Sequence, residues 1–598
     1  MRLFAAAVAL LALLGTPASG QRLLPSANSD SAAGGRARAI ARLLEPGGAE
    51  EGAAAYVRGA GGGGSDDAYL ADALPLASSA ERASWPAAAG ARADWVRDFW
   101  TRHAAEAGES VAERLVQHFQ RLAVAGRDYR ARSQRGAPPE GAIRLVGHDS
   151  AIPYEDRGLV YIRYGRPDGI IVSHVPGARP HELWAYQGVG SAPRTFLFVA
   201  VPSAPGMWLT EDALQLVVPG QFDITRRMEV TRAAKYAGTP FDDAVAVLAD
   251  LAPADPLIQR FYQRVQHARA VFSTKRCQYA GSCERPSTYA TDADVNEEFY
   301  QAVMRPYLAA REDYTAAART AGLAALEAEE GAPRFDRPLP FYYDRATFRG
   351  RDGLTDVIAP IAVPAAMLPS VGLADGRIAF SPRVIFSVSD AAAVRAAVTD
   401  TVIRVASSRR LGPRDYLRLV VAVAAQPSTH ARHRIVVRAE NDPMLGQLYS
   451  RPDTVPDYRG SAFMMSDLVL AAGEEGGTWR RGAALLSFIP PRQFPARGKV
   501  KLFYELYNLQ PGERITTEIA LERGRNDVWS RIRGLFRDRQ QVALAFQTDA
   551  RSDSAGTVQE VRLLQPNLQP GAYRIVVRVT RVTGGQALRR ELRFDLLR

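Results

Sequence analysis

The sequence predicts an α+β multidomain protein. A helical N-terminal part with a small β-meander is followed by two β-sandwich domains of the immunoglobulin-like type in series. Three observations predict this fold class. Apolar residues recur at helical spacing up to about residue 130, and the pattern then changes to short runs rich in β-branched and aromatic residues. From residue 338 to the end, such runs alternate with turn residues, which is typical of serial sandwiches.

Residues 1–20 have the pattern of a cleavable secretory signal peptide, in which Arg2 precedes the apolar run Leu3–Leu14 and small residues follow. This run is too short to cross a hydrocarbon core, which needs about 20 apolar residues. We therefore expect cleavage near Gly20, and no transmembrane helix in the mature chain. No cysteine stands at the cleavage region to carry a lipid. The chain is expected to be exported, and to be periplasmic or associated with the outer membrane.

The net charge of +11 does not by itself indicate a nucleic-acid partner. Only four of the 75 basic residues are lysine, and the arginines are spread along the chain, which indicates a compositional bias rather than a phosphate-binding surface. The two cysteines, Cys277 and Cys283, are expected to form a disulfide in an oxidising compartment. A zinc site would need a second ligand pair at metal spacing, so neither a metal nor a cofactor is expected.

The N-terminal part contains segments in which apolar residues recur at helical spacing. They are Arg36–Leu44, Ala49–Arg58, Ala91–His103 and Glu109–Arg130. Trp95, Phe99 and Trp100 share one stripe, which we interpret as core. The next segments are interpreted as strands of the meander: Leu159–Gly165, Ile170–His174, His181–Gln187 and Arg194–Val201. Helices are expected again at Asp242–Leu251, Leu257–Phe272 and roughly Val295–Glu329.

The C-terminal half contains two series of expected strands. The first comprises Phe341–Arg349, Thr355–Ile361, Arg377–Val388, Val398–Val405, Tyr416–Ala424, Arg432–Arg438 and Met464–Ala472. The second comprises Ala483–Ile489, Val500–Leu509, Arg514–Leu521, Gln541–Gln547, Val558–Leu564, Gly571–Val579 and Ala587–Leu596. His430 and His433 are expected to be exposed in a turn that enters a strand. The expected organisation is 1–20 signal peptide, 21–90 helical and flexible segment, 91–205 helical plus meander domain, 206–335 helical region with the cysteine loop, 336–478 sandwich and 479–598 sandwich.

Several motifs in one order resemble the GWxTD-domain family of exported bacterial proteins. They are FW at Phe99-Trp100, DRGLVYIRYGRPD at Asp156–Asp168 and HELWAY at His181–Tyr186. The namesake motif is replaced by Ile152-Pro153-Tyr154-Glu155-Asp156, in which only the aspartate is retained. The resemblance implies an exported protein of this architecture and carries no established activity. The motif residues are Phe99, Trp100, Asp156, Arg157, Gly158, Tyr164, Gly165, Pro167, Asp168, Glu182 and Trp184.

Physical chemistry favours structural roles for these residues. Gly165, Pro167 and Asp168 suit a tight turn. Glu182 lies within reach of Arg157 or Arg163 as a bidentate partner. The alternative is a groove on which Asp156, Asp168, Glu182 and His181 converge as acid/base residues of an envelope-polymer hydrolase.

The sequence contains neither a nucleophile elbow nor a phosphate-binding loop. The main hypothesis is therefore an exported scaffold or interaction protein, whose partner is another envelope protein or polymer. The alternatives are the hydrolase and glycan binding by a sandwich domain. Glycan binding would need an exposed row of aromatic residues, for which Tyr504, Tyr507 and Trp529 are the candidates.

Overall fold

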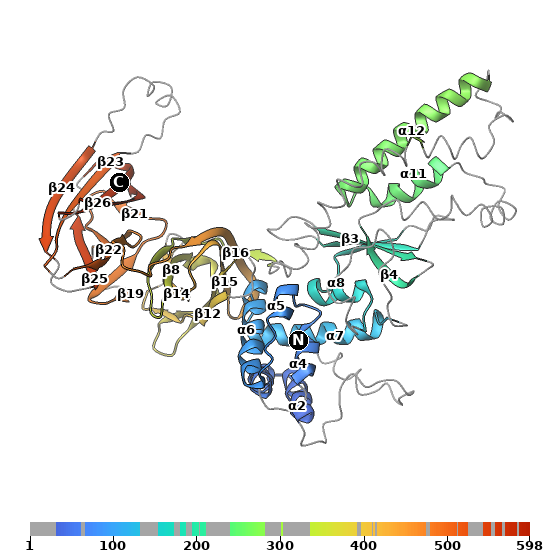
Figure 1. Ribbon diagram of the computed structural model, residues 1–598, viewed down its shortest axis with the longest axis horizontal. Coiled ribbons are helices and arrows are strands. Elements are labelled where there is room, and N and C mark those ends of the chain that lie inside the picture. The colour runs from blue at the N-terminus through green and yellow to red at the C-terminus, as the bar shows by residue number, and fades with distance from the viewer. Residues whose placement is uncertain are drawn as a thin grey trace. The chain divides into compact units, whose positions relative to one another are not determined.

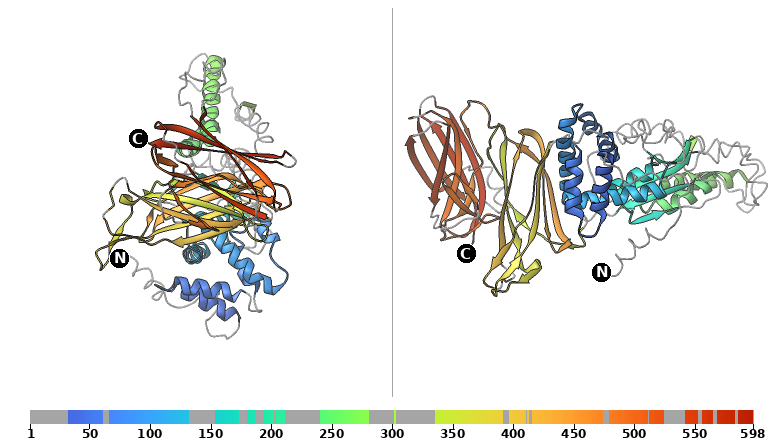
Figure 2. Two further views of the ribbon diagram at one scale, coloured as in Figure 1. Left: turned by 90° about the vertical axis from the view of Figure 1, so that its left-hand side faces the viewer. Right: turned by 90° about the horizontal axis from the view of Figure 1, so that it is seen from below.

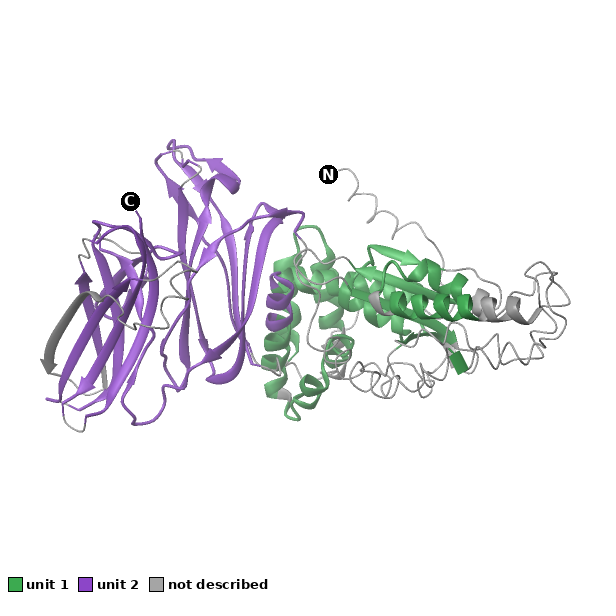
Figure 3. Cartoon of the chain, turned by 90° about the horizontal axis from the view of Figure 1, so that it is seen from above, with its two compact units in different colours: residues 1–100, 111–186, 193–327 green, residues 101–110, 187–192, 328–598 purple. Residues whose placement is uncertain are grey.

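The computed structural model shows an α+β multidomain chain, with helices and one small sheet in its N-terminal half and largely antiparallel sheets in its C-terminal half (Figure 1). It describes residues 32–60, 66–131, 153–172, 180–186, 194–201, 204–210, 240–280, 301–302, 335–390, 396–409, 411–412, 415–473, 479–510, 512–523, 542–551, 556–564, 568–582 and 585–597. The chain divides into two compact units (Figure 3). Unit 1 comprises 1–100, 111–186 and 193–327, and unit 2 comprises 101–110, 187–192 and 328–598.

Six helices lead the described chain. They are α2 (Ala32–Leu44), α3 (Ala49–Gly59), α4 (Asp66–Ala73), α5 (Ser79–Ala83), α6 (Ala89–Ala107) and α7 (Val111–Asp128). The start of α5 is fixed by a capping box, in which Ser78 and Glu81 each bond the other's backbone N–H. Tyr56, Trp100 and Leu115 are fully buried in the core of unit 1. The helices expected at 36–44, 49–58, 91–103 and 109–130 are confirmed within a few residues at either end.

The segment expected as the first strand of the meander is a helix, α8 (Asp156–Tyr164). Short apolar runs do not distinguish strand from helix by periodicity alone. Here Leu159 and Ile162 lie one turn apart in the core, and Asp156 is buried at the first turn. Gly165 then ends the helix at a φ of +76°, and its N–H donates to the carbonyl of Tyr161. A glycine after a helix in this left-handed region is a common C-terminal signal.

Four antiparallel strands in sequential order follow α8. They are β1 (Gly169–Ile171), β2 (His181–Tyr186), β3 (Arg194–Val201) and β4 (Ala204–Thr210). The last of these was not expected, and it continues the sheet beyond residue 205. Leu183, Leu197 and Val199 pack on a pair of helices, α11 (Pro240–Leu251) and α12 (Pro256–Ala280). These helices run side by side (Figure 1), and both were predicted from the sequence.

Residues 335–458 of unit 2 form the first two-sheet module. One sheet has the order β12-β11-β15-β16-β5, the other has β14-β8-β6 with β7 beside β8, and a small third sheet has β13-β10-β9. The strands are β5 (Arg337–Pro338), β6 (Tyr342–Tyr343), β7 (Ala346–Arg349), β8 (Thr355–Pro364), β9 (Ser370–Gly372), β10 (Ile378–Phe380), β11 (Pro382–Ser389), β12 (Ala396–Val402), β13 (Val405–Ser407), β14 (Tyr416–Ala425), β15 (Ser428–Ala439) and β16 (Asp442–Val455). Alternate β14 residues from Leu417 to Ala425 enter the core that both large sheets share.

One long strand, β16, was not expected from the sequence. It contains Pro443, Gly446 and Pro452, which normally indicate loops. In the structure β16 pairs with β15 along one side and with only two residues of β5 along the other. Its outer side therefore tolerates residues that lack or weaken a ladder hydrogen bond.

Residues 463–597 form the second two-sheet module (Figure 2). Its sheets have the orders β17-β22-β18-β20-β19, with β25 beside β22, and β21-β27-β26-β23-β24. The strands are β17 (Met464–Met465), β18 (Val469–Ala472), β19 (Trp479–Arg481), β20 (Ala484–Phe488), β21 (Gln493–Pro495), β22 (Val500–Leu509), β23 (Arg514–Arg523), β24 (Val542–Arg551), β25 (Gly556–Leu564), β26 (Gly571–Arg581) and β27 (Ala587–Leu597). Because β17 and β18 pair with β22, strands of this module begin before the expected boundary at 479.

An apolar cluster joins the two modules of unit 2. Ala346, Phe348 and Ile358 of the first module pack with Leu486, Phe503 and other buried residues of the second. The junction between the modules therefore has a hydrophobic core of its own. In the part of the chain that the structure describes, no helix is both long and apolar enough to cross a membrane.

Candidate functional site

The aromatic residues of the family-like motif are core residues of unit 1. Phe99, Trp100, Tyr164 and Trp184 are all buried. Phe99 contacts Trp100 edge to face at 5.1 Å between centroids, and Trp184 contacts Phe198 in the same way at 5.0 Å. As the sequence analysis expected of the first two, they fill the interior.

A group of residues that we call the α8 cluster joins α8 to β2. It consists of Tyr129, Glu155, Arg157, Glu182 and Trp184. The Arg157 guanidinium donates to Glu155 at 2.6 Å and to Glu182 at 2.8 Å, and it lies 5.4 Å from the centroid of the Tyr129 ring. The indole N–H of Trp184 donates to the other oxygen of Glu182 at 2.8 Å. Of the two partners expected for Glu182, Arg157 is the one that bonds to it here, through a single hydrogen bond and not through the expected bidentate pair.

Hydrogen bonds and charge interactions of Arg157 with Glu155 and Glu182 stabilise the α8 cluster. Burial alone would lower the pKa of Arg157, but its hydrogen bonds and charge interactions with Glu155 and Glu182 outweigh burial, so the pKa is raised. Both carboxylate oxygens of Glu182 accept hydrogen bonds from inside the cluster. This arrangement fastens a helix to a strand.

The other acid/base candidates occupy separate positions around α8. Asp156 is fully buried, and its carboxylate accepts the backbone N–H of Leu209 at 2.8 Å, which ties α8 to β4. His181 is buried at the start of β2. Asp168 is exposed in the turn after α8, where its backbone N–H donates to the carbonyl of Ala185. For Asp156 and Glu182, the described contacts are those of residues that hold the fold together.

The glycines of the motif have steric roles. A Cβ at Gly158 would lie 3.0 Å from the Cβ of Tyr154 and 3.2 Å from that of Tyr129, so a larger residue would push these chains apart. Gly165 has positive φ, and its carbonyl accepts the hydroxyl of Tyr186 at 3.0 Å. Pro167 is buried in the turn that follows.

Several sequence-based candidates fall outside the described residues. These are the signal peptide, Cys283 and therefore the predicted disulfide with Cys277 of α12, the helix expected near 295–329 apart from residues 301–302, and Trp529. Within the described ranges, no three His, Cys, Asp or Glu side chains are grouped so as to hold a metal ion.

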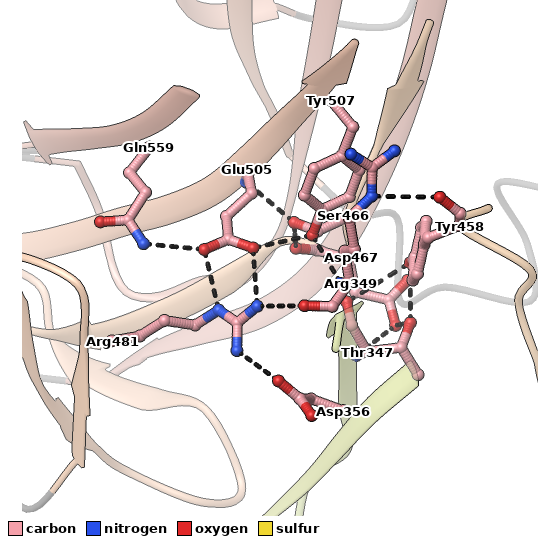
Figure 4. Close-up of polar contacts among 10 residues, drawn as sticks. All are labelled: Thr347, Arg349, Asp356, Tyr458, Ser466, Asp467, Arg481, Glu505, Tyr507 and Gln559. Carbon is pink, nitrogen blue, oxygen red and sulfur yellow. Dashed lines mark hydrogen bonds and ion pairs between the residues drawn. The ribbon is translucent and has the colours of Figure 1, made fainter. Parts of the chain in front are cut away.

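A polar network, here called the junction network, lies between the modules of unit 2 (Figure 4). Arg481 donates to both oxygens of Glu505, at 2.8 and 3.0 Å, to Asp356 at 2.7 Å, and to the carbonyl of Arg349 at 2.7 Å. Asp356 and Arg349 belong to the first module, and Arg481 and Glu505 to the second. Tyr507 also donates to Glu505, whose side chain is only 2% exposed. The network therefore joins the modules through satisfied charges.

A second group of contacts extends the junction network. The hydroxyl of Tyr507 accepts the backbone N–H of Arg349 at 2.9 Å, and the Arg349 guanidinium lies 4.5 Å from the centroid of the Tyr507 ring. Thr347 donates through its hydroxyl to Asp467 at 2.6 Å. Burial by itself would lower the pKa of Arg481. The hydrogen bonds to Glu505 and Asp356 outweigh burial, so the pKa is raised.

Tyr504 and Tyr507, two of the candidates for an exposed aromatic row, cannot form one. Both are fully buried, and burial raises the pKa of Tyr504 to about 12. The burial pattern of β22 shows why, because eight of its ten residues are buried. The strand is covered on both faces, by the core of the second module and by the junction. The alternation of apolar and polar residues in the sequence could not show that the second face of β22 is covered by the junction with the other module.

An aromatic cleft of about 560 Å³ opens in unit 2, with side chains from both modules. This volume is within the range of about 300–1,000 Å³ that is typical of small-molecule sites. Tyr342 is 47% exposed and Tyr416 is 42% exposed, and their rings contact each other at 5.9 Å between centroids. Tyr343 and Tyr449 are half-buried, with ring centroids 5.8 Å apart. These four tyrosines give the cleft its aromatic surface.

Charged side chains border the aromatic cleft. Arg492, from the second module, forms an ion pair with Asp344 at 3.0 Å. Burial raises the pKa of Asp344, and the charge of Arg492 acts in the opposite direction. Asp453 lies 2.6 Å from Arg345 and 3.0 Å from Nδ1 of His433. His433 is only 6% exposed, so the expectation that it lies in the solvent is wrong.

Sequence reasoning missed this cleft. Its clearest signal is the run Phe341-Tyr342-Tyr343-Asp344, which lies just after Pro338 and Pro340. Three consecutive aromatic residues cannot all face one core from a strand, because successive side chains point to opposite faces. The remaining members, Tyr416 and Tyr449, are contributed by pairing across strands that are distant in sequence.

No family model matches the chain, and no curated protein matches it. The chain is distantly similar to several solved structures. A red sea bream transglutaminase is 10% identical with a TM-score of 0.12, over 53% of this chain and 37% of the transglutaminase. The native form of E. coli alpha-2-macroglobulin is 12% identical with a TM-score of 0.15, over 43% of this chain and 14% of the macroglobulin.

A third solved structure is a tetra-tandem repeat from the extending region of a large adhesion protein. It is 9% identical with a TM-score of 0.13, over 43% of this chain and 50% of the repeat structure. The chain spans less than two thirds of each of these proteins, and TM-scores this low carry no inference about function.

Proposed function

We propose that this chain is an exported cell-envelope protein that works by binding, as a scaffold or interaction protein, and that its partner is another envelope protein or polymer. The signal-like residues 1–20 and the motif order of the GWxTD-domain family support export. The facing, largely antiparallel sheets of both modules, each with alternating core residues, support immunoglobulin-like sandwiches.

The observation that carries this proposal is the aromatic cleft on a pair of modules that are fastened together. Asp344 and Arg492 come from different modules and meet at the cleft, while the junction network holds the same two modules beside it. A preorganised surface of this kind lowers the ordering cost of association. The carboxylates of Asp156 and Glu182, which a hydrolase would need, are engaged in bonds that hold α8 in place.

The test is photo-crosslinking in living bacteria. The full chain, with its own N-terminus, carries a photo-reactive phenylalanine analogue at Tyr342 or Tyr416. The matched control position is Val582, which is 57% exposed on the second module and outside the cleft. We expect a shortened mature chain in the envelope fraction and adducts from the two cleft positions that greatly exceed those from Val582. An unprocessed chain in the cytosol, or equal adducts at all three positions, would overturn the proposal.

A further inference from the structure

The tyrosines of the aromatic cleft form a platform rather than a slot. The rings of Tyr342 and Tyr416 are tilted by 57° and contact each other, so they leave no gap of ring width between them. A tyrosine offers an apolar ring face and a hydroxyl at its rim. Such a surface matches a flat ligand that has both C–H faces and hydroxyl groups, as a sugar ring does. A proline-rich peptide, in contrast, docks into grooves between aromatic side chains.

The platform is built on paired strands. Tyr342 lies opposite Ala362 in the β6–β8 ladder, and Tyr416 lies opposite Pro364 in the β14–β8 ladder. The neighbouring Phe341 is buried and contacts Tyr449, another tyrosine of the cleft, edge to face at 4.7 Å. Sites on strands with packed support are held more precisely than sites on loops. The rings are therefore in place before a ligand arrives.

The charges around the cleft do not balance. Three guanidinium groups, from Arg345, Arg451 and Arg492, and one carboxylate, from Asp344, line the cleft, and the carboxylate of Asp453 pairs with Arg345, so three cationic side chains meet two carboxylates. Arg345 pairs with Asp453, and Arg492 pairs with Asp344. Within the described residues, Arg451 has no carboxylate partner, and its guanidinium lies 5.8 Å from the centroid of the Tyr343 ring.

An unpaired arginine beside an aromatic platform selects for a particular ligand chemistry. The guanidinium group binds a carboxylate through two parallel hydrogen bonds. Arg451 is exposed, so a ligand that lies on the tyrosines is able to reach it. Sugar faces for the rings and a carboxylate for the arginine are combined in one class of molecule, the acidic saccharides.

We infer that the aromatic cleft binds a saccharide chain that carries carboxylate groups, with sugar rings on Tyr342 and Tyr416 and a carboxylate on Arg451. This inference rests on the proposed binding function and names the ligand class for the same site. It requires both modules, because Arg492 fixes Asp344 at the edge of the cleft.

The experiment is calorimetric titration of the purified mature chain with three matched probes. One is an oligogalacturonate, the second is the same oligosaccharide with its carboxylates methyl-esterified, and the third is a hyaluronan hexasaccharide. We expect at least one acidic probe to bind, and the ester to bind about tenfold more weakly than its acid, because a hydrogen-bonded charge is lost. Added salt should weaken the binding of the acidic probes.

Variants locate the site. Tyr342→Ala and Tyr416→Ala should each weaken the binding of acid and ester alike, whereas Arg451→Gln should weaken only that of the acid. Val371→Ala and Arg459→Gln are the controls, because both residues are exposed in unit 2 and lie outside the cleft. They should bind as the parent does. Far-UV circular dichroism confirms that each variant is folded.

The outcomes separate this inference from the proposed function. If no acidic saccharide binds while a protein or peptide crosslinks at Tyr342, the saccharide assignment is overturned and the binding function stands. If neither probes nor crosslinks reach the cleft, both are overturned. Binding that survives Tyr342→Ala and Tyr416→Ala together would also overturn the assignment, because the ligand would then lie elsewhere.

Discussion

The α8 cluster of unit 1 and the aromatic cleft of unit 2 contain the same kinds of residue in different balance. In each, an arginine lies near a tyrosine ring, at 5.4 Å for Arg157 and Tyr129 and at 5.8 Å for Arg451 and Tyr343. Arg157 is 19% exposed and is bonded to two glutamates. Arg451 is exposed and, among the described residues, has no carboxylate partner.

This difference shows how structural and ligand-binding polar groups are told apart. Acidic residues and tryptophans in a motif attract attention in a sequence, but the charges of the α8 cluster pair with one another. In the cleft, the guanidinium of Arg451 and the exposed rings of Tyr342 and Tyr416 remain available to a ligand. A group with unused bonding capacity next to open volume is a better guide to binding than residue type.

The largest loss of stability is expected from a substitution in the junction network, where the charged groups bond to one another most completely. Arg481→Met leaves Glu505, 2% exposed, without its cation, and it should lower the free energy of unfolding by about 3–5 kcal/mol. The neighbouring Arg480→Met is the control, because Arg480 is exposed on the same strand, and its change should stay within about 0.5 kcal/mol. Urea unfolding followed by far-UV circular dichroism measures both. Equal values for the two variants would show that the network adds no stability.

Replacing each arginine by methionine tests the difference between Arg157 of the α8 cluster and Arg451 of the aromatic cleft. Arg157→Met should destabilise unit 1 by about 2–3 kcal/mol, because partly buried Glu155 and Glu182 lose their partner. Arg451→Met should change stability by no more than about 0.5 kcal/mol, since no ion pair is broken. Thermal unfolding of the full chain, with tryptophan fluorescence as the probe, measures the difference. Similar losses from both variants would remove the distinction between the two arginines.

The next largest loss of stability is expected from adding a side chain at Gly165, where the backbone has a positive φ. Gly165→Ala places a Cβ at φ +76°, 3.0 Å from the Arg121 guanidinium, so it should cost about 1–2 kcal/mol. Gly169→Ala is the matched control, because it has no positive φ and no atom within 4 Å of the added Cβ. Differential scanning calorimetry of the two variants should show a lower melting temperature for the first only. If the second melts as early, the helix end at Gly165 is not the cause.

Sequence patterns predicted most of the strands of unit 2 because each of its modules buries one face of most strands, and alternation follows from that burial. They failed at α8, where a helix buried on most sides loses its period, and at β16, where an outer strand tolerates prolines. The sequence offered Arg157 or Arg163 as partners of Glu182, because opposite charges in neighbouring elements tend to pair, and the structure shows the bond to Arg157. The aromatic cleft was not, because Tyr342, Tyr416 and Tyr449 meet only through long-range strand pairing. Burial of Tyr507 depended likewise on a neighbouring module that sequence does not position.

The smallest effect is a pH dependence with opposite signs at two aspartates. Burial raises the pKa of Asp344 above 3.8, so the folded chain binds this proton more tightly, and the stability it contributes is present below pH 3.8 and lost as pH rises through the raised pKa. Hydrogen bonds from Arg459 lower the pKa of exposed Asp457 to about 2, so its contribution is present above 3.8 and lost as pH falls toward 2. Denaturant unfolding between pH 2 and 6 compares the parent with Asp344→Asn and Asp457→Asn. The parent's advantage should fall with pH against the first variant and rise against the second. If both stability differences changed with pH in the same direction, Asp344 would be hydrated in the folded cleft. The carboxylate beside Arg492 would then be open to solvent and not held as part of a preorganised site.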